Sequence, residues 1–332
     1  MTDRKSDEEY IASIRGAATI SPETRKSYEK GLKRVLKLVT QGRQKAVDIG
    51  WIVRHATRAF ALIEQGVENR SSLRTLVATI LAVLKHAGVK KEHPRIFSKW
   101  YEIYKPLKRE TDGREKLSQA EGRLLKAAVK WEDVLAARDA LEYGSKDHLL
   151  LSMYTYIPPR RQEDYYKVRI LSSLPHPHGY KKEPSYIDMT REPMRLTVTE
   201  YKTAKSYQDW TKDLTDATLV DIIKTSVRQS PREYMFTQKN GSPFKTANAF
   251  TCYSNRALKK HVGPNVTVNS LRHAAAKASL TDPNKTDQEQ EEYALDMGHS
   301  YEMHRKYRKV ISEEAYASNK VREQRPKKVL VA

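Results

Sequence analysis

The sequence predicts a mainly α-helical protein of the α+β class with one small antiparallel sheet. Three observations lead to this prediction. Apolar residues recur at helical spacing through most of the 332-residue chain. Short alternating or β-branched runs, which are typical of strands, are confined to residues 168–201. A polar stretch over residues 106–117, with Pro106 and Asp112-Gly113, indicates a linker between a helical first domain and a mixed second domain.

Residues 21–105 are expected to form a small helical bundle behind a flexible N-terminus of residues 1–20. The bundle begins at Ser21-Pro22-Glu23, which supplies a capping hydroxyl, a first-turn proline and an acid that the helix dipole favours. Three apolar stripes, each closed by a glycine, and a shorter fourth helix complete it. Basic residues crowd its first two helices: Arg25, Lys26, Lys33, Arg34, Lys37, Arg43, Lys45, Arg54 and Arg58. They either contact phosphates or form an ordinary solvated face.

Residues 118–316 are expected to form the second domain, before a tail of residues 317–332. A capping box from Ser118 to Glu121 opens its first helix. Strands are expected at 168–171, 186–188 and 194–201, and the last of them enters a hairpin that carries Lys202. Further helices are expected at about 131–143, 146–156, 216–228, 246–261, 271–280, 288–297 and 302–318.

The net charge of the chain is +20, from 61 Lys and Arg against 41 Asp and Glu. Residues 1–110 contribute +11 and the remainder contributes +9, so the basic excess is not confined to a detachable tail. A polyanion held by both domains would account for this distribution. The charge therefore favours a nucleic acid, either DNA or RNA; an acidic membrane surface or simple solubility is the alternative.

The composition, 39% hydrophobic and 31% charged, is that of a globular protein with a charged surface. No apolar run approaches the roughly 18 residues of a membrane span, and the N-terminus is too polar for a secretory signal. The single cysteine, Cys252, excludes an internal disulfide framework and a cysteine-based zinc site. It fits an intracellular, reducing compartment.

The most informative stretch runs from Val268 to Val310. It places Arg272 near the start of an alanine-rich helix, His299 directly after Gly298, and Tyr307 eight residues after that histidine. An arginine and an imidazole can bind a phosphate, and a tyrosine hydroxyl within reach can attack it. Cutting a phosphodiester without a metal needs such a nucleophile, cations for the non-bridging oxygens and a proton donor for the leaving oxygen.

The order of these residues resembles that of the tyrosine recombinases, the phage and mobile-element integrases. The resemblance rests on five boxes: Arg161 with Asp164, Lys202 in a hairpin, Asn-Ser-Leu-Arg272-His, Met-Gly-His299-Ser, and Tyr307-Arg-Lys-Val. It covers about residues 115–315 for a catalytic domain and, more weakly, residues 20–105, which are similar to the family's core-binding domain. The Pro-Pro-Arg-Arg form of the first box is similar to versions carried by viruses and mobile elements of eukaryotes.

The resemblance implies that the chain cleaves and rejoins double-stranded DNA at specific sites as a tetramer, with no metal, cofactor or ATP. The implied site residues are Tyr307 as nucleophile, Arg161, Arg272 and His299 as phosphate ligands, Lys202 as proton donor to the leaving 5′ oxygen, and Asn269 as an assisting donor. The nucleophile would form a 3′-phosphotyrosyl bond. C-terminal segments in the family often reach into a neighbouring subunit, and the basic and apolar tail is a candidate for this role.

Two of these assignments have a close competitor. Arg160 competes with Arg161, which is preferred because Asp164 follows it at the family's spacing, and Lys205 competes with Lys202. Three other tyrosines do not fit the family's spacing from the histidine: Tyr293, Tyr301 and Tyr316.

The chain also departs from the family's pattern. Asn269 stands where a histidine or lysine is usual, and an amide can donate a hydrogen bond but takes no proton at neutral pH. The His299–Tyr307 separation is one residue shorter than is common, and residues 281–290 form an inserted loop. A type IB topoisomerase-like enzyme, a catalytically weakened DNA-binding protein of the same fold, and a metal-dependent DDE-type integrase are the alternatives; no convincing acidic triad supports the last.

Overall fold

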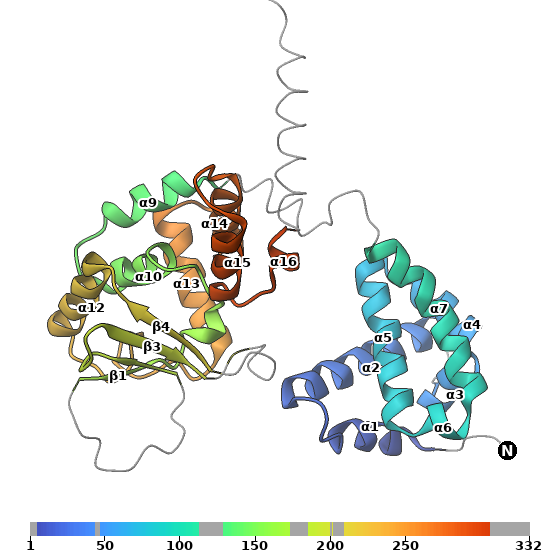
Figure 1. Cartoon of the computed structure of the whole chain (residues 1–332). Coiled ribbons are helices and arrows are strands. Elements are labelled where there is room, and N and C mark those ends of the chain that lie inside the picture. Colours follow the sequence, from blue (N-terminus) through green and yellow to red (C-terminus); the bar gives the residue numbers. More distant parts are fainter. Residues whose placement is uncertain are drawn as a thin grey trace, which may run out of the picture. The chain divides into compact units, whose positions relative to one another are not determined.

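The structure of the chain is a computed structural model that describes residues 5–43, 47–112, 129–172, 185–199, 201 and 209–305. It divides into two compact units, Met1–Lys116 (unit 1) and Leu117–Ala332 (unit 2). The described part is mostly helical with one four-stranded sheet, which confirms the predicted fold class (Figure 1). No helix in these ranges combines the length and the apolar character that crossing a membrane requires.

The regular elements among the described residues of unit 1 are all helices. Its helices are α1 (Asp7–Arg15), α2 (Pro22–Arg43), α3 (Ile49–Arg54), α4 (Ala56–Gln65), α5 (Arg70–His86), α6 (Val89–Glu92) and α7 (Pro94–Asp112). As predicted, α2 begins after Ser21, whose hydroxyl accepts a hydrogen bond from the Thr24 amide at 3.2 Å. Helix α5 packs against α1, α2 and α7 (Figure 1). Its Leu73, Val77 and Leu84 are completely buried, so α5 is the centre of the unit's core.

The N-terminal segment, expected to be flexible, contains α1. Ser6 and Glu9 form a capping box, in which each side chain accepts a hydrogen bond from the other residue's backbone amide. Tyr10 and Ile14 are buried in the core of unit 1. The sequence-based prediction missed this helix because its apolar face consists of few residues within a polar segment.

The predicted linker begins later than expected, because α7 continues to Asp112. Leu107 is buried, and Arg74 of α5 donates hydrogen bonds to Thr111 and to Asp112, each at 2.6 Å. These contacts hold the end of α7 against α5, although the proline inside the helix removes one backbone hydrogen bond. Residues 113–117 of the predicted linker lie outside the described residues.

Unit 2 combines helices with the sheet. Its elements are α9 (Trp131–Asp139), α10 (Lys146–Thr155), the 3₁₀ helix η1 (Gln162–Asp164), β1 (Arg169–Leu171), β2 (Tyr186–Asp188), β3 (Met194–Val198), β4 (Trp210–Leu214), α12 (Ala217–Gln229), α13 (Ala247–His261), α14 (Val268–Thr281), α15 (Asp287–Asp296) and α16 (Tyr301–Arg305). The helices predicted between residues 131 and 297 are present. The capping box predicted at residues 118–121 lies outside the described residues, as does the tail.

The strands lie in the order β1–β2–β3–β4. β2–β3 and β3–β4 pair antiparallel, and β3 and β4 are the two strands of the predicted hairpin. β1 and β2 pair in parallel, so the prediction of a purely antiparallel sheet is wrong for this pair. An alternating pattern identifies a strand but does not fix its direction. The connection between residues 171 and 186 has about the dozen residues that a parallel crossover needs.

Helix α10 is the innermost helix of unit 2, with every residue from His148 to Tyr154 buried. It contacts α9, α12 and α13, and α12 in turn contacts β4. Helix α14 packs against α13 and α15, and α15 packs against α16 (Figure 1). This packing brings the C-terminal helices against the segment that leads into η1.

The central position of α5 leads to a stability prediction. Leu73→Ala should lower the free energy of unfolding by about 2–5 kcal/mol, because it removes a fully buried side chain and leaves a cavity. Lys85→Ala, at an exposed position of the same helix, should change it by less than about 0.5 kcal/mol. Urea unfolding followed by circular dichroism measures both, and equal effects of the two substitutions would contradict the assigned core.

Candidate active site

Arg272 joins three segments of unit 2. It lies in the second turn of α14, which begins with a capping box between Thr267 and Ser270, and its side chain is buried. One terminal nitrogen, Nη1, donates hydrogen bonds to the carbonyls of Pro159 at 2.6 Å and Met297 at 3.0 Å. The other, Nη2, lies 3.4 Å from Nδ1 of His299. Arg272 therefore holds the segment before η1 and the end of α15 in fixed positions.

His299 follows a left-handed turn at the end of α15. Gly298 has φ +75°, and the backbone amide of His299 donates to the carbonyl of Ala294 at 3.2 Å. The imidazole is 8% exposed. Burial lowers the pKa of His299 to about 3, and Arg272 adds to this shift. Smaller contributions in the same direction come from His304, Arg161 and His273.

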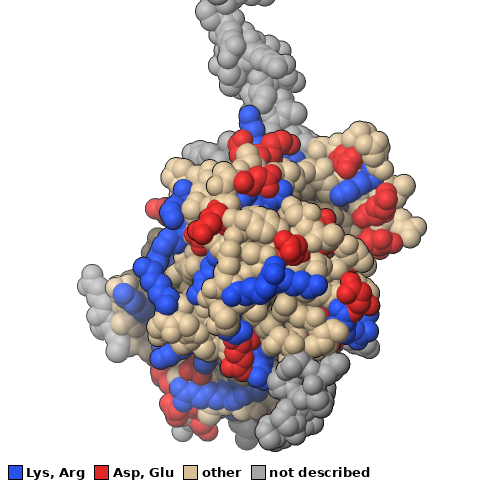
Figure 2. All heavy atoms as spheres, turned by 90° about the vertical axis from the view of Figure 1, so that its left-hand side faces the viewer, with Lys and Arg blue, Asp and Glu red and all other residues tan. Residues whose placement is uncertain are grey.

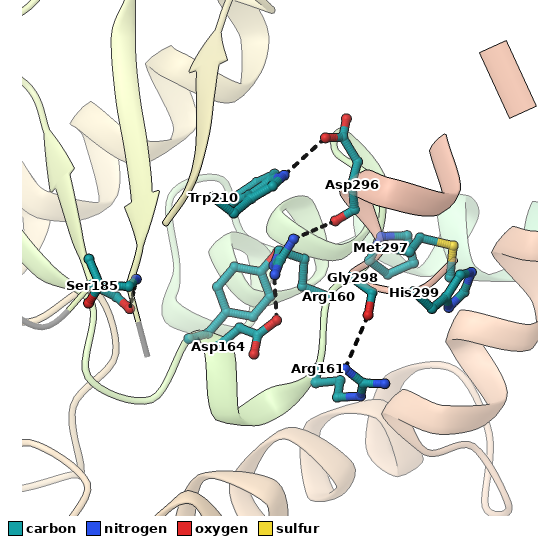
Figure 3. A network of polar contacts seen from close by, with 12 residues as sticks. Arg160, Arg161, Asp164, Ser185, Trp210, Asp296, Met297, Gly298 and His299 are labelled. Atoms are coloured by element: carbon teal, nitrogen blue, oxygen red, sulfur yellow. Dashed lines mark hydrogen bonds and ion pairs between the residues drawn. The ribbon is translucent and has the colours of Figure 1, made fainter. Parts of the chain in front are cut away.

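Arg161 approaches the same turn from the segment before η1. Its Nη1 donates a hydrogen bond to the carbonyl of Gly298 at 3.2 Å (Figure 3), and its side chain is half-buried. The remaining donors of its guanidinium can therefore reach an anion from solvent. Among the described residues, Arg161, Arg272 and His299 thus meet around the turn at Gly298.

Arg160 is the arginine that Asp164 pairs with, at 2.9 Å between Nε and Oδ2. It is fully buried and donates from Nη1 to the backbone carbonyl of Asp296 at 2.8 Å. Its guanidinium lies over the ring of Trp210, at 4.2 Å from the centroid (Figure 3). It also lies 4.9 Å from the centroid of the Tyr201 ring. The spacing of Asp164 that favours Arg161 in the sequence therefore does not reflect an ion pair between these two residues. Arg160 is fully buried, whereas Arg161 is half-buried.

Asp296 was not singled out from the sequence. It ends α15, and its carboxylate accepts a hydrogen bond from Trp210 Nε1 at 3.0 Å (Figure 3). It accepts a second from Lys212 Nζ at 2.7 Å, and both donors are on β4. It therefore ties the first half of β4, at the loop end of the β3–β4 pair, to the turn that carries His299. The sequence does not distinguish Asp296 from the other acidic residues of this helix. Only its position next to the Met-Gly-His motif could have indicated a role.

Of the remaining predicted site residues, the structure describes only Asn269. Asn269 is exposed in the first turn of α14, and it makes no hydrogen bond to the residues of the cluster within the described ranges. Lys202, its competitor Lys205, and Tyr307 lie outside the described residues, as does Tyr316. The hydroxyl of Tyr301 donates to Asp287 at 2.9 Å, on the outer side of α15.

A cavity of about 220 Å³ lies beside the cluster. Its lining includes Arg160, Tyr201, Trp210, Gly298 and His299. Arg161 and Arg272 do not line this cavity, but with His299 they surround the turn at Gly298, where two guanidinium groups and an imidazole can bind an anion through hydrogen bonds to its oxygens. No group of three or more His, Cys, Asp or Glu that could hold a metal ion is found in the described part of the chain.

Comparisons with known proteins identify no family model and no curated protein that matches the chain. Solved structures do match. The Tn1549 transposon integrase in complex with transposon right end DNA is 12% identical, over 91% of this chain and 94% of that chain, with a TM-score of 0.49. XerA recombinase is 14% identical, over 94% and 98%, with a TM-score of 0.35.

The turn at Gly298 leads to a prediction with a matched control. A Cβ at this position would lie 3.3 Å from Nη2 of Arg160, whereas one at Gly241, which has a similar φ of +81°, would have no atom within 4 Å. Gly241→Ala should cost about 1–2 kcal/mol of unfolding free energy for the left-handed backbone alone. Gly298→Ala should cost measurably more in denaturant titrations. Equal costs would mean that Arg160 does not restrict the turn.

A second prediction concerns the charge of His299. Its pKa is about 3 in the folded chain and ordinarily 6.5, so the ring should stay neutral from pH 8 down to pH 5. Below pH 6.5 the unfolded chain takes up a proton that the folded chain does not, so this histidine makes the protein less stable as the pH falls toward 3. Histidine NMR titration measures the pKa. In Arg272→Met the pKa should move back toward 6.5, and an unchanged pKa would remove the arginine as a cause.

Proposed function

We propose that this chain is a DNA strand-cleaving and rejoining enzyme of the tyrosine recombinase type, acting at specific sites. The observation that carries the proposal is the convergence of Arg161, Arg272 and His299 on one turn. Arg161 lies more than a hundred residues before Arg272 and His299 in the chain, and all three belong to the motifs that resemble the family. Convergence of cationic and imidazole donors is what the binding of a phosphate requires.

In the proposed reaction the Tyr307 oxygen bonds to phosphorus and the bond between phosphorus and the 5′ oxygen breaks. Lys202 gives a proton to that oxygen, and the phenolic proton passes to a base or to water. Asn269, which cannot act as that base, assists as a hydrogen-bond donor. The 3′-phosphotyrosyl bond conserves the energy of the broken bond, so reversal by another 5′ hydroxyl needs no ATP. Both Lys202 and Tyr307 enter this proposal from the sequence motifs alone.

The arginines and the histidine would bind the two non-bridging oxygens. Arg161 supplies the donors that face solvent, while Arg272 is held in place by the carbonyls of Pro159 and Met297. His299 is neutral before DNA binds, because burial and the nearby cations lower its pKa. The negative charge of a bound phosphate opposes those cations, so binding favours the imidazolium, which can donate to a phosphate oxygen.

The basic residues on the surface of unit 2 are not spread evenly, and one groove is suited to contact with DNA. On the side of the molecule seen in Figure 2, Lys and Arg are interspersed with Asp and Glu, so that side offers no continuous basic field. A groove of about 700 Å³ between the start of α10 and α13 is different, since Lys146, Lys239, Arg256 and Lys260 line it. Such a groove suits a phosphate backbone. Exchange of strands between two sites would require four chains, as the family resemblance implies.

One observation favours a second candidate, a DNA-binding protein of the same fold that no longer cuts. Asn269 replaces the usual base and makes no hydrogen bond to the cluster among the described residues. A chain of this kind would bind DNA tightly without forming a covalent adduct.

The decisive experiment uses nicked DNA that carries the native ends of the element. Wild-type protein should form an adduct that survives denaturing electrophoresis, and Tyr307→Phe should abolish it, because the phenolic oxygen is the bond-forming atom. A chelator should have no effect. Tight DNA binding without any adduct would replace the proposed function by the second candidate. An adduct on unrelated sequences as readily as on native ends would favour a topoisomerase-like activity.

The same assay tests the assignment of the two arginines. Arg161→Ala should slow adduct formation by about 100-fold or more, since it removes a donor to the phosphate oxygens. It should leave the unfolding midpoint nearly unchanged because the side chain is half-buried. Arg160→Met should instead cost about 3–5 kcal/mol of stability, because it leaves Asp164 buried without its partner. The reverse pattern would exchange their roles.

A further inference from the structure

His304 is a buried histidine with no part in the reaction described above. It lies on α16, is 0% exposed, and its Nδ1 lies 3.1 Å from Nε2 of His299. The two rings are 5.3 Å apart between centroids. Two imidazoles in direct hydrogen-bond contact require that one donates and the other accepts.

The donor can be assigned from the other neighbour of His299. An arginine only donates, so Nδ1 of His299, which faces Nη2 of Arg272 at 3.4 Å, must be the acceptor and carry no proton. The proton of the neutral ring is then on Nε2, which donates to Nδ1 of His304. The contact with His304 is the shorter of the two, so it is the stronger restraint on the ring.

His304 is itself well fixed. Its backbone amide donates to the carbonyl of Ser300 at 3.0 Å. Its ring packs against Tyr293 of α15, with centroids 5.9 Å apart. The Nζ atom of Lys285 lies over the ring of Tyr293, 4.4 Å from its centroid. A buried acceptor held on two sides can orient the group that donates to it.

We propose that His304 is a positioning residue, which holds His299 as the Nε2–H tautomer and keeps its Nδ1 edge turned toward Arg272. This inference rests on the proposed function, because the Nδ1 edge is where His299 would meet the phosphate. When that phosphate binds and His299 takes up a proton, Nδ1 becomes the donor to it, while Nε2 keeps its bond to His304. The catalytic contact is made by His299, and His304 acts through it.

Two isosteric amides test the proposal. The side-chain oxygen of asparagine can take the place of Nδ1 of a histidine, whereas the amide of glutamine reaches the place of Nε2. His304→Asn should therefore keep the acceptor for His299, and His304→Gln should lose it, although glutamine is closer to histidine in length. A role in packing alone predicts that glutamine is tolerated at least as well.

Two readouts are compared in the full-length protein. The first is the nitrogen-15 spectrum of labelled histidines, with the His299 signals assigned by their loss in His299→Asn. Wild type and His304→Asn should show the Nε2–H tautomer, and His304→Gln should show a mixture. The second is the rate of adduct formation on nicked DNA, with DNA affinity measured separately. His304→Asn should stay within about 3-fold of wild type, while His304→Gln should fall about 10-fold or more with unchanged affinity.

The outcomes separate the two proposals. If His304→Gln keeps the wild-type tautomer, or if both variants lose it equally, the positioning role is overturned whatever the activity. If the tautomer shifts in His304→Gln but its adduct rate equals that of wild type, the role is overturned for the reaction. If wild type forms no adduct, the proposed function fails, and the spectra alone still decide whether His304 orients His299.

Discussion

The buried guanidinium of Arg272 is the constraint on which the candidate site depends. It binds the carbonyls of Pro159 and Met297 and faces the ring of His299, so one side chain joins the start of the η1 segment to the end of α15. A buried arginine is tolerated only when its donors are satisfied. The carbonyls therefore stabilise the cation, and the cation in turn fixes where the turn at His299 lies.

A second buried arginine supports the first from the side of the sheet. Arg160 pairs with Asp164 and binds the carbonyl of Asp296, whose carboxylate is shared by Trp210 and Lys212 of β4. The adjacent arginines of one motif thus have different tasks. The buried one holds the scaffold together, and the half-buried one keeps donors available for an anion. Substitution of Arg160 should lower the stability of the fold, and substitution of Arg161 should weaken the binding of the anion.

The sequence was sufficient for the fold class and for most helices, because helical periodicity is a local signal. The meeting of Arg161, Arg272 and His299 was expected only because their motifs resemble those of a known family. The sequence did not predict the features that depend on a contact between residues far apart in the chain. The parallel pairing of β1 with β2, the end of α7 held by Arg74, and the partner of Asp164 all depend on such contacts. His304 was overlooked for the same reason, since a histidine in a basic segment becomes informative only when its neighbour is known.

Arg161, Arg272 and His299, which would bind the phosphate, all belong to unit 2. On the proposed function, the residues that cleave DNA lie in unit 2, and basic residues that help to select the DNA lie in unit 1. Substitutions on the basic helices of unit 1 can change which DNA the chain holds, and how tightly, without disturbing a single contact of the two arginines or the imidazole. A lineage of such enzymes could therefore acquire new targets by altering one half of the chain, while the other half keeps the same chemistry.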